Sequence, residues 1–569
     1  MPAPAASVSR SALRAPAPPA AAGASTAWPW IGIIALALGL RVGHVLALVQ
    51  QPVFWDANTQ GGSDMSGFIR FASRMAAEGG FWDRRGVYTY SPPLFPFLLA
   101  GLFRLLGPDL ALAAAVQAVL SAATCLAIGW MAWSLFGERR IATLAGGLAA
   151  LYGPFIFFTT KLHATTLELA AAALAFGAIA WAIRGPVPRR WFAAGLALGI
   201  AALGRPTFVV VAGGTAIGLL AQPAPRLRDR LGAAAMVGLG AGTVVVAAVV
   251  RNVLLGGPWV PITGQMDAAW RLANSYDSSA LNFRYPRGPL MPVASWAFWA
   301  QQARKAALFW WGYEAPQNMN YYFIREFSPV LRLPLVTFWF VAPLAWLGLW
   351  WSRHRCRELL PLTSAVLAYY VITILFLITA RYRIPIVPAL MPFAAFALVG
   401  LWDRARAGGW RAAAPPGLFC LALMAAAMPH RERLIHSTEY AYLARDAAAR
   451  GDGARAQWAL QRGVRLFPRA LGERVEAATA VLRAAKDGAA ESPLSEGRRQ
   501  LYLGISTLLT EGPPREAREH LRRAAAAFPE DPTATPLGRL LATFSPDART
   551  SRPPGGSPGG ATDRPPGDR

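Results

Sequence analysis

The sequence has little charge and almost no cysteine. Charged residues make up 15% of its 569 residues, against 54% hydrophobic residues, a balance that water-soluble domains rarely have. The 3 cysteines, Cys125, Cys356 and Cys420, lie in or against apolar runs. They are too few and too scattered for a disulfide framework or a cysteine-based metal site. We therefore exclude a disulfide-rich secreted domain and expect the cysteines to be packing residues.

Lysine is also scarce, although the formal net charge is +25. Lys161, Lys305 and Lys486 are the only lysines, so the positive excess is arginine, spread through short segments between apolar runs and through the C-terminal region. This distribution is typical of the cytoplasmic loops of membrane proteins, which follow the positive-inside rule. It favours a membrane protein and predicts no nucleic-acid partner.

Apolar runs are the dominant feature of the first 430 residues. Each run is close to the roughly 20 residues that a bilayer-spanning helix needs. They cover 28–50, 110–136, 140–158, 164–184, 231–254, 332–351, 359–379, 383–402 and 411–428. Shorter apolar pieces at 92–107, 191–203 and 205–221 are broken by Pro or Gly, which predicts short, tilted or re-entrant helices that line a cavity. The sequence predicts an all-α polytopic membrane protein with about eleven or twelve membrane segments.

The arginine clusters between these runs give the predicted orientation. They place the N-terminus in the cytoplasm and the C-terminal region outside it. Two long segments are also predicted to lie outside the cytoplasm; we name them the first outer loop (51–91) and the large outer loop (255–331). Residues 92–136 contain two apolar pieces, the short 92–107 and the long 110–136, but the orientation allows only one net crossing of the membrane between them. The short piece, 92–107, is therefore predicted to be partly re-entrant.

Composition divides the chain into four predicted parts. Residues 1–27, rich in Ala, Pro and Ser, form a disordered cytoplasmic N-terminus, and 28–429 form the membrane domain. Residues 430–545 are rich in Ala, Arg and Glu and form an extracytoplasmic helical domain. The tail, 546–569, has Pro-Pro-Gly-Gly runs and no apolar residues for a core, so it is predicted to be disordered.

Two stretches of the C-terminal domain share one spacing. Each has a tyrosine, Tyr442 or Tyr502, ahead of a glycine, an alanine and a proline: Gly451, Ala456 and Pro468, then Gly512, Ala517 and Pro529. The stretches resemble degenerate tetratricopeptide repeats, helical hairpins that stack into a concave surface. We expect this domain to dock a protein partner or an acceptor; the alternative is a plain helical cap on the bundle.

A carboxylate and two guanidiniums are the strongest candidates for chemistry. Asp64, Arg205 and Arg381 each sit beside an apolar span, on the side predicted to be outside. Phe68, Phe71, Ala72 and Met75 follow Asp64 at helical spacing, which predicts an amphipathic surface helix. Asp64 is then either its N-cap or a functional group. Arg205 lies at a break between two apolar pieces, where it either binds an anion or snorkels to the interface.

Several motifs carry a family resemblance. In chain order they are Asp64 with its helix, Ser91-Pro-Pro-Leu-Phe-Pro, Leu151-Tyr-Gly-Pro-Phe-Ile-Phe-Phe, the run ending Gly-Arg205-Pro-Thr, Trp311-Gly-Tyr-Glu-Ala-Pro-Gln-Asn, and Arg381-Tyr-Arg-Ile-Pro. This ordered set resembles the polyprenyl-phosphate-sugar glycosyltransferases of the GT-C superfamily, and more closely the bacterial protein-mannosyltransferase-like family. The resemblance implies a polyprenyl-phosphate-linked sugar donor and a catalytic aspartate in the first outer loop.

By this resemblance Asp64 is the catalytic residue, either as general base toward the acceptor or as a residue that helps to organise a metal. Asp56 is the alternative. Arg205 and Arg381 are predicted to bind the lipid phosphate, because guanidiniums match a pair of phosphate oxygens. Further candidate substrate-binding residues are Lys161, His163, Tyr90, Glu314 and Tyr382, with interface anchoring as the alternative for Lys161 and His163.

The chain also departs from the family pattern. Many relatives have a second acidic residue where this chain has Lys161 and His163, and Glu168 lies deeper along the span. Phe68 replaces a tyrosine found in several relatives. The sequence therefore gives no indication of whether a metal or another cofactor is required.

The predicted function is transfer of a sugar from a polyprenyl-phosphate-linked donor to a lipid, glycan or protein acceptor, on the outer face of a bacterial inner membrane. One carboxylate with nearby cations suffices for a single-displacement, inverting reaction. Two alternatives stay open: a multi-pass transporter or flippase of a phosphorylated lipid, and a scaffold without catalytic activity.

Overall fold

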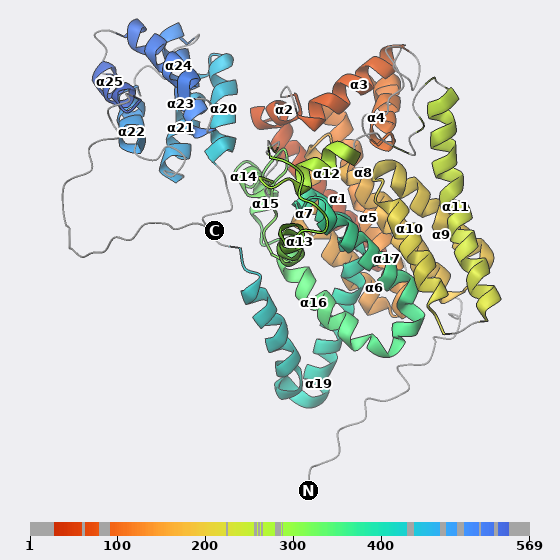
Figure 1. Ribbon diagram of the computed structural model, residues 1–569. Coiled ribbons are helices and arrows are strands. Elements are labelled where there is room, and N and C mark those ends of the chain that lie inside the picture. Colours follow the sequence, from red (N-terminus) through yellow and green to blue (C-terminus); the bar gives the residue numbers. More distant parts are fainter. Residues whose placement is uncertain are drawn as a thin grey trace, which may run out of the picture. The chain divides into compact units, whose positions relative to one another are not determined.

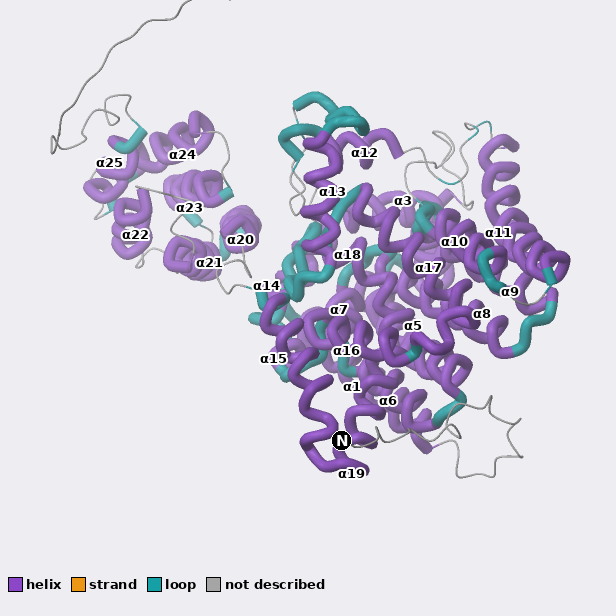
Figure 2. The backbone as a smooth tube through the Cα atoms, turned by 60° about the horizontal axis from the view of Figure 1, so that its bottom comes forward, coloured by secondary structure: helices purple, strands orange, loops and turns teal. Residues whose placement is uncertain are grey.

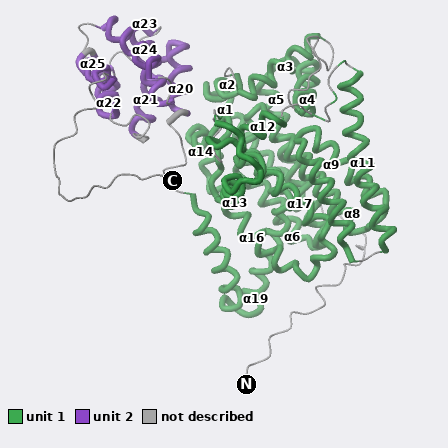
Figure 3. Tube along the Cα trace, in the orientation of Figure 1, with its two compact units in different colours: residues 1–434 green, residues 435–569 purple. Residues whose placement is uncertain are grey.

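The computed structural model describes the helical core of the chain and most of its connections. The described residues are 28–59, 63–78, 92–223, 226–254, 256, 259, 262, 266–278, 286, 288–429, 437–466, 474–485, 494–510, 514–528 and 533–544. The predicted disorder of 1–27 and of 546–569 therefore lies outside the described residues. The chain divides into two compact units, 1–434 and 435–569 (Figure 3).

The first unit is a bundle of helices (Figures 1 and 2). Its helices are α1 (Trp28–Val49), α2 (Pro52–Thr59), α3 (Asp64–Glu78), α4 (Leu94–Leu106), α5 (Leu110–Phe136), α6 (Arg139–Ala150), α7 (Gly153–Phe157), α8 (Thr165–Arg184), α9 (Pro188–Gly204), α10 (Phe208–Leu220), α11 (Leu227–Leu254), α12 (Met266–Asn274), α13 (Trp296–Phe309), α14 (Tyr321–Ile324), α15 (Pro329–Arg332), α16 (Phe338–Trp351), α17 (Cys356–Leu375), α18 (Ala380–Arg383) and α19 (Val387–Ala426). Within the described residues there is no strand beyond isolated bridges, so the all-α prediction is confirmed.

Six helical stretches of the described chain are long and apolar enough to cross a membrane, which agrees with the predicted membrane protein. They are Pro29–Val49, Leu110–Phe136, Thr165–Arg184, Leu227–Leu254, Arg353–Leu375 and Ala380–Ala426. The last stretch contains a break at Gly409, whose φ of 67° is left-handed. Three further apolar helices, α4, α10 and α16, are shorter. The predicted count of spans was thus larger than the number of full-length helices described.

Two predicted spans are shorter than expected. The run 140–158 does not form one helix, because α6 ends at Ala150 and the chain becomes extended at Tyr152. There the backbone of Gly153 donates to the carbonyl of Val336 at 2.8 Å, which interrupts the helical hydrogen bonds. The run 332–351 loses its first residues to the same pairing, and α16 begins at Phe338.

A buried arginine stabilises the break after α6. Arg41 of α1 is fully buried, and its guanidinium donates to the carbonyls of Ala149 and Ala150 at 3.3 and 3.1 Å. These carbonyls belong to the last turn of α6, where helical partners are missing and the helix dipole favours a cation. Ser121 Oγ accepts a third bond at 2.8 Å. Arg41 thus supplies the hydrogen bonds that a continuous helix would have made.

The predicted short helix at 92–107 is confirmed as α4. Its 13 residues extend about 20 Å, less than the hydrocarbon thickness of about 30 Å. It ends at Leu106 and is followed by the C-cap Gly107. The carboxylate of Asp109 then caps α5 by accepting the N–H groups of Ala111 and Leu112 at 2.8 and 3.0 Å. Figure 1 shows α4 beside α3 at one end of the unit, opposite the break in α19.

The second unit is a set of short helices. They are α20 (Ser437–Ala449), α21 (Gly453–Leu466), α22 (Val475–Ala484), α23 (Glu496–Leu509), α24 (Pro514–Ala527) and α25 (Ala534–Ala542). α20 packs on α21 and α23 on α24, and the predicted repeat alanines, Ala456 and Ala517, are fully buried. Tyr502 is also buried, but Tyr442 is 40% exposed and Tyr440 takes the buried place instead. Gly512, Pro468 and Pro529 lie outside the described residues, so the repeat assignment stays a prediction.

Candidate active site

Asp64 begins the surface helix α3, as predicted, but it does not cap it. The capping bond comes from Ser63, whose Oγ accepts the backbone N–H of Ser66 at 3.2 Å. The buried side of α3 includes Phe68, Ala72 and Met75, which confirms the predicted amphipathic helix. Because Ser63 supplies the cap, the carboxylate of Asp64 is available for other partners, and the N-cap alternative is wrong.

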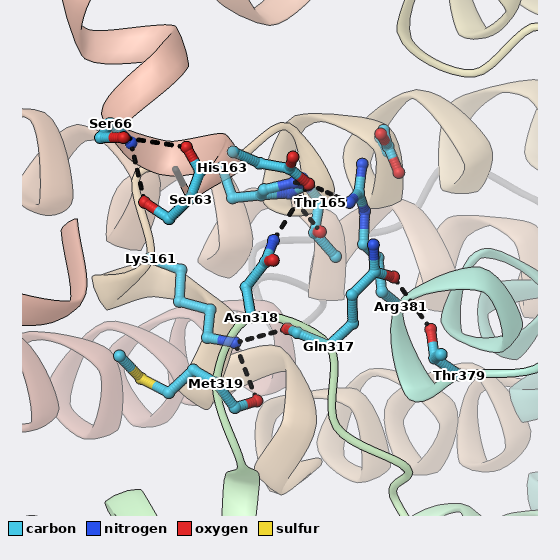
Figure 4. A network of polar contacts seen from close by, with 12 residues as sticks. Ser63, Ser66, Lys161, His163, Thr165, Gln317, Asn318, Met319, Thr379 and Arg381 are labelled. Carbon is cyan, nitrogen blue, oxygen red and sulfur yellow. Dashed lines mark hydrogen bonds and ion pairs between the residues drawn. The ribbon is translucent and has the colours of Figure 1, made fainter. Parts of the chain in front are cut away.

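The carboxylate of Asp64 meets groups from three distant segments. Its Oδ2 accepts from Arg381 Nη1 at 2.8 Å and from Asn318 Nδ2 at 3.0 Å, and His163 Nε2 lies 3.6 Å away. Figure 4 shows Asn318, His163 and Arg381 converging from their separate segments. The side chain of Asp64 is 45% exposed and that of Arg381 is 15% exposed. A ligand from outside the protein can therefore reach this ion pair.

The surroundings of Asp64 favour its ionised form. Burial by itself raises the pKa of its carboxyl, but His163, Arg381 and Asn318 offset this by charge and hydrogen bonding, and the net effect is a pKa well below the ordinary value. Burial lowers the pKa of His163 to about 4, so this imidazole is neutral at pH 7. The N–H of Thr165 donates to His163 Nδ1 at 3.2 Å, which leaves the ring proton on Nε2, facing Asp64.

Lys161 does not line an open phosphate site. Its side chain is 3% exposed, and its ammonium donates to the carbonyls of Gln317 and Met319 at 3.4 and 3.1 Å (Figure 4). It also lies 4.4 Å from the ring centre of Phe157. The interface-anchor alternative is therefore wrong for Lys161, which instead holds the loop between α13 and α14.

Arg205 lies at the predicted break, between α9 and α10. Its Nε donates to Glu168 Oε2 at 2.9 Å, its Nη2 contacts the same oxygen, and both side chains are buried. Nη2 also reaches the carbonyl of Arg381 at 3.4 Å, and the guanidinium lies 4.9 Å from the ring centre of Tyr382. Snorkelling is wrong for Arg205, since the group is not at a surface. The pair instead braces the backbone that carries Arg381.

Glu314 forms a second sealed ion pair. Its Oε2 accepts from Arg383 Nη2 at 2.8 Å and its Oε1 accepts the backbone N–H of Phe338 at 3.2 Å. The side chains of both ionic partners are no more than 3% exposed. Arg383 donates further to the carbonyls of Phe309 and Tyr313 at 3.2 and 2.9 Å. These contacts contradict the predicted hydrogen bond between Glu314 and a sugar, because the side chain is buried and both of its oxygens already accept hydrogen bonds from the protein.

Three predicted site residues remain: Asp56, Tyr90 and Tyr382. Asp56 lies in α2, and another residue of that helix, Asn58, makes hydrogen bonds to the segment that precedes His163. The Nδ2 of Asn58 donates to the carbonyl of Thr160 at 3.0 Å, and its Oδ1 accepts the N–H of Leu162 at 2.8 Å. Tyr90 lies outside the described residues. Tyr382 contributes its ring, which lies near the guanidiniums of Arg205 and Arg381.

One residue of the site, Asn318, was not predicted from the sequence. Asn318 lies in a loop far from Asp64 in sequence, and its only local signal is that Asn tolerates the left-handed conformation that it adopts here, with a φ of 65°. Within the described part of the chain, no three His, Cys, Asp or Glu side chains are placed to hold a metal. The neighbours of Asp64 turn N–H donors toward it and offer no further metal-binding atom, so the described residues do not fit a metal site.

Comparison with solved structures gives distant similarities. The chain is similar to the oligosaccharyltransferase of Archaeoglobus fulgidus in its apo form, with 14% identity and a TM-score of 0.41 over 74% of this chain and 58% of that one. It is also similar to ArnT from Cupriavidus metallidurans bound to undecaprenyl phosphate, with 16% identity and a TM-score of 0.44 over 91% and 85% of the two chains. The chain thus spans less than two thirds of the archaeal protein.

Among curated proteins nothing matches the chain. Residues 90–252, which include α4 to α10 and most of α11, match the model of the family described as dolichyl-phosphate-mannose-protein mannosyltransferase. This match confirms the resemblance to the protein-mannosyltransferase-like family predicted from the sequence: over these residues the chain is similar to a family of glycosyltransferases.

Proposed function

We propose that this protein is a membrane glycosyltransferase that moves a sugar from a polyprenyl-phosphate-linked donor to an acceptor. The observation that carries the proposal is the partly exposed pair of Asp64 and Arg381, in which the proposed base and the proposed phosphate-binding cation lie 2.8 Å apart. The family match over residues 90–252 supports the class of reaction. ArnT was solved with undecaprenyl phosphate, which supports this class of donor lipid.

In the proposed reaction the donor phosphate takes Arg381 away from Asp64. The guanidinium offers several N–H groups in a plane that matches two phosphate oxygens. Negative charge grows on the phosphate as the bond from the anomeric carbon to its oxygen breaks, and a fixed cation in a site with little water stabilises that charge. The lipid phosphate is the leaving group.

Asp64 then serves as general base. The acceptor hydroxyl attacks the anomeric carbon from the opposite side, and its proton passes to the carboxylate, which is ionised at neutral pH. One new carbon–oxygen bond forms as one breaks, so the configuration is inverted and no covalent enzyme intermediate arises. Loss of the Arg381 contact makes Asp64 a stronger base at the moment when the donor is bound.

We assign Arg205 a supporting role in place of the predicted direct contact with phosphate. It is held by Glu168 and contacts the carbonyl of Arg381 at 3.4 Å. A guanidinium fixed behind Arg381 restricts the backbone of α18. The orientation with the site and the C-terminal unit outside the cytoplasm, in a bacterial inner membrane, belongs to the same proposal. So does docking of a lipid, glycan or protein acceptor on that unit.

Native mass spectrometry of the detergent-purified protein with added polyprenyl phosphate tests the proposal. Wild type is compared with Arg381→Gln and with Arg140→Gln, a matched control because Arg140 forms an exposed pair with Asp403 at the same 2.8 Å. We expect binding to weaken in Arg381→Gln alone. A folded wild type that binds no polyprenyl phosphate would contradict the proposal. Lipid binding with lipid movement across vesicles, but without sugar transfer, would favour the flippase instead.

A further inference from the structure

The loop that carries Asn318 is held in place from both sides. On one side Lys161 bonds the carbonyls of Gln317 and Met319, the two neighbours of Asn318 in sequence. On the other side, the N–H of Ala380 donates to the carbonyl of Ala315 at 2.9 Å, next to Arg381. The hydroxyl of Thr379 also contacts Gln317 Oε1 at 3.2 Å. The position of Asn318 is thus fixed relative to the segments that bear His163 and Arg381.

The backbone of Asn318 is in an unfavourable region. Its φ of 65° is the single positive φ of a non-glycine residue in the described chain. Such conformations persist where the surroundings enforce them, and they often occur at functional sites. Here the enforced conformation brings Asn318 Nδ2 to 3.0 Å from Asp64 Oδ2. Since an ionised carboxylate only accepts hydrogen bonds, the amide NH₂ group must face it.

The two hydrogen-bond donors to Asp64 differ in what they can do next. Arg381 is charged and is attracted to an arriving phosphate. The amide of Asn318 is neutral and has no charge to pair with the phosphate, so it keeps its bond to the carboxylate. We propose that Asn318 is a positioning residue, which holds and orients Asp64 for proton transfer after Arg381 has turned to the donor. This inference rests on the proposed function and adds a residue that the reaction requires.

A simpler role for Asn318 is that of a turn residue. Asn is tolerated in the left-handed region because its short side chain makes local hydrogen bonds. Glycine fits this region better than any other residue. The variant Asn318→Gly therefore keeps the turn and removes only the amide, while Asn318→Asp keeps the size and places a carboxylate opposite Asp64. The two variants separate positioning from backbone geometry.

Sugar transfer, polyprenyl phosphate binding and thermal stability are measured for wild type and both variants. Positioning predicts that Asn318→Gly loses roughly 10- to 100-fold in kcat, the effect of one hydrogen bond to a charged group, with lipid binding and stability retained. Asn318→Asp is expected to lose at least as much. In both, the acid limb of the kcat/KM profile, which reports the free enzyme, moves to higher pH, because Asp64 loses the Asn318 donor while Arg381 and His163 still face it. In Asn318→Asp the added carboxylate raises the pKa of Asp64 further.

Asn318→Gly with the kcat and pH profile of wild type would overturn the positioning role and leave the proposed function intact. Wild-type protein that binds lipid phosphate but transfers no sugar from a panel of polyprenyl-phosphate sugars would overturn both. The two failures are therefore distinguishable in one set of measurements.

Discussion

Three ion pairs near α18 have the same chemistry and different surroundings. Glu168 with Arg205 and Glu314 with Arg383 are sealed, with side chains no more than 6% exposed. Asp64 with Arg381 is open, with its carboxylate 45% exposed. The sealed pairs are buried among internal partners and fix the backbone, whereas the open pair can exchange its partner for a ligand. Exposure therefore separates the candidate catalytic group from its supports.

The largest expected effect is on the open pair. Asp64→Asn keeps the size of the side chain and removes the base, so the rate of sugar transfer is expected to fall by roughly 10²- to 10⁴-fold. The melting temperature should fall less than on loss of a sealed pair, because the carboxylate is partly exposed. Transfer in reconstituted vesicles measures this, with Asp403→Asn as the control at another exposed pair. Equal transfer by Asp64→Asn and wild type would show that the open pair has no catalytic role.

Breaking a sealed pair is expected to lower the thermal stability of the protein. Arg383→Met leaves Glu314 buried without its cation and frees the carbonyls of Phe309 and Tyr313. Removing one partner of a buried pair costs about 3–5 kcal/mol, so thermal unfolding in detergent should begin at a markedly lower temperature. An unchanged melting temperature would contradict the distinction between sealed and open pairs.

The pH dependence of stability sharpens the same distinction. His163 is neutral in the folded protein because burial lowers its pKa to about 4. Between the ordinary value of about 6.5 and about 4 the unfolded chain binds a proton that the folded one does not, so stability falls as pH drops through this range. His163→Gln should reduce the slope of the melting temperature against pH between pH 7 and 4. A wild-type slope that persists in His163→Gln would assign the titration to another group.

The smallest effect is expected for an ion pair in which both side chains are exposed. Arg140 and Asp403 are 56% and 46% exposed, and surface pairs contribute about 0–1 kcal/mol. Arg140→Gln should therefore leave thermal stability, lipid binding and transfer close to wild type. A loss of transfer in this variant would mean that exposure and charge alone do not single out Asp64 and Arg381.

Local patterns made part of the site predictable from sequence. The spacing from Phe68 to Met75 predicted α3, and the Gly-Arg-Pro break predicted the place of Arg205 between two helices. The roles of Glu168 and Glu314 were not predictable, because ion-pair partners 37 and 69 residues apart meet only through tertiary packing. The run 140–158 was misjudged for the same reason, since the pairing of Gly153 with Val336 and the bonds from Arg41 override its apolar composition.

The most direct test of the account is the coupling between Asp64 and Arg381 in polyprenyl phosphate binding. Native mass spectrometry compares wild type, Asp64→Asn, Arg381→Gln and the double variant. If the phosphate takes Arg381 from Asp64, Asp64→Asn binds several-fold tighter than wild type, Arg381→Gln binds more weakly, and the gain from Asp64→Asn shrinks when Arg381 is absent. Equal or weaker binding by Asp64→Asn would contradict the exchange and, with it, the proposed site.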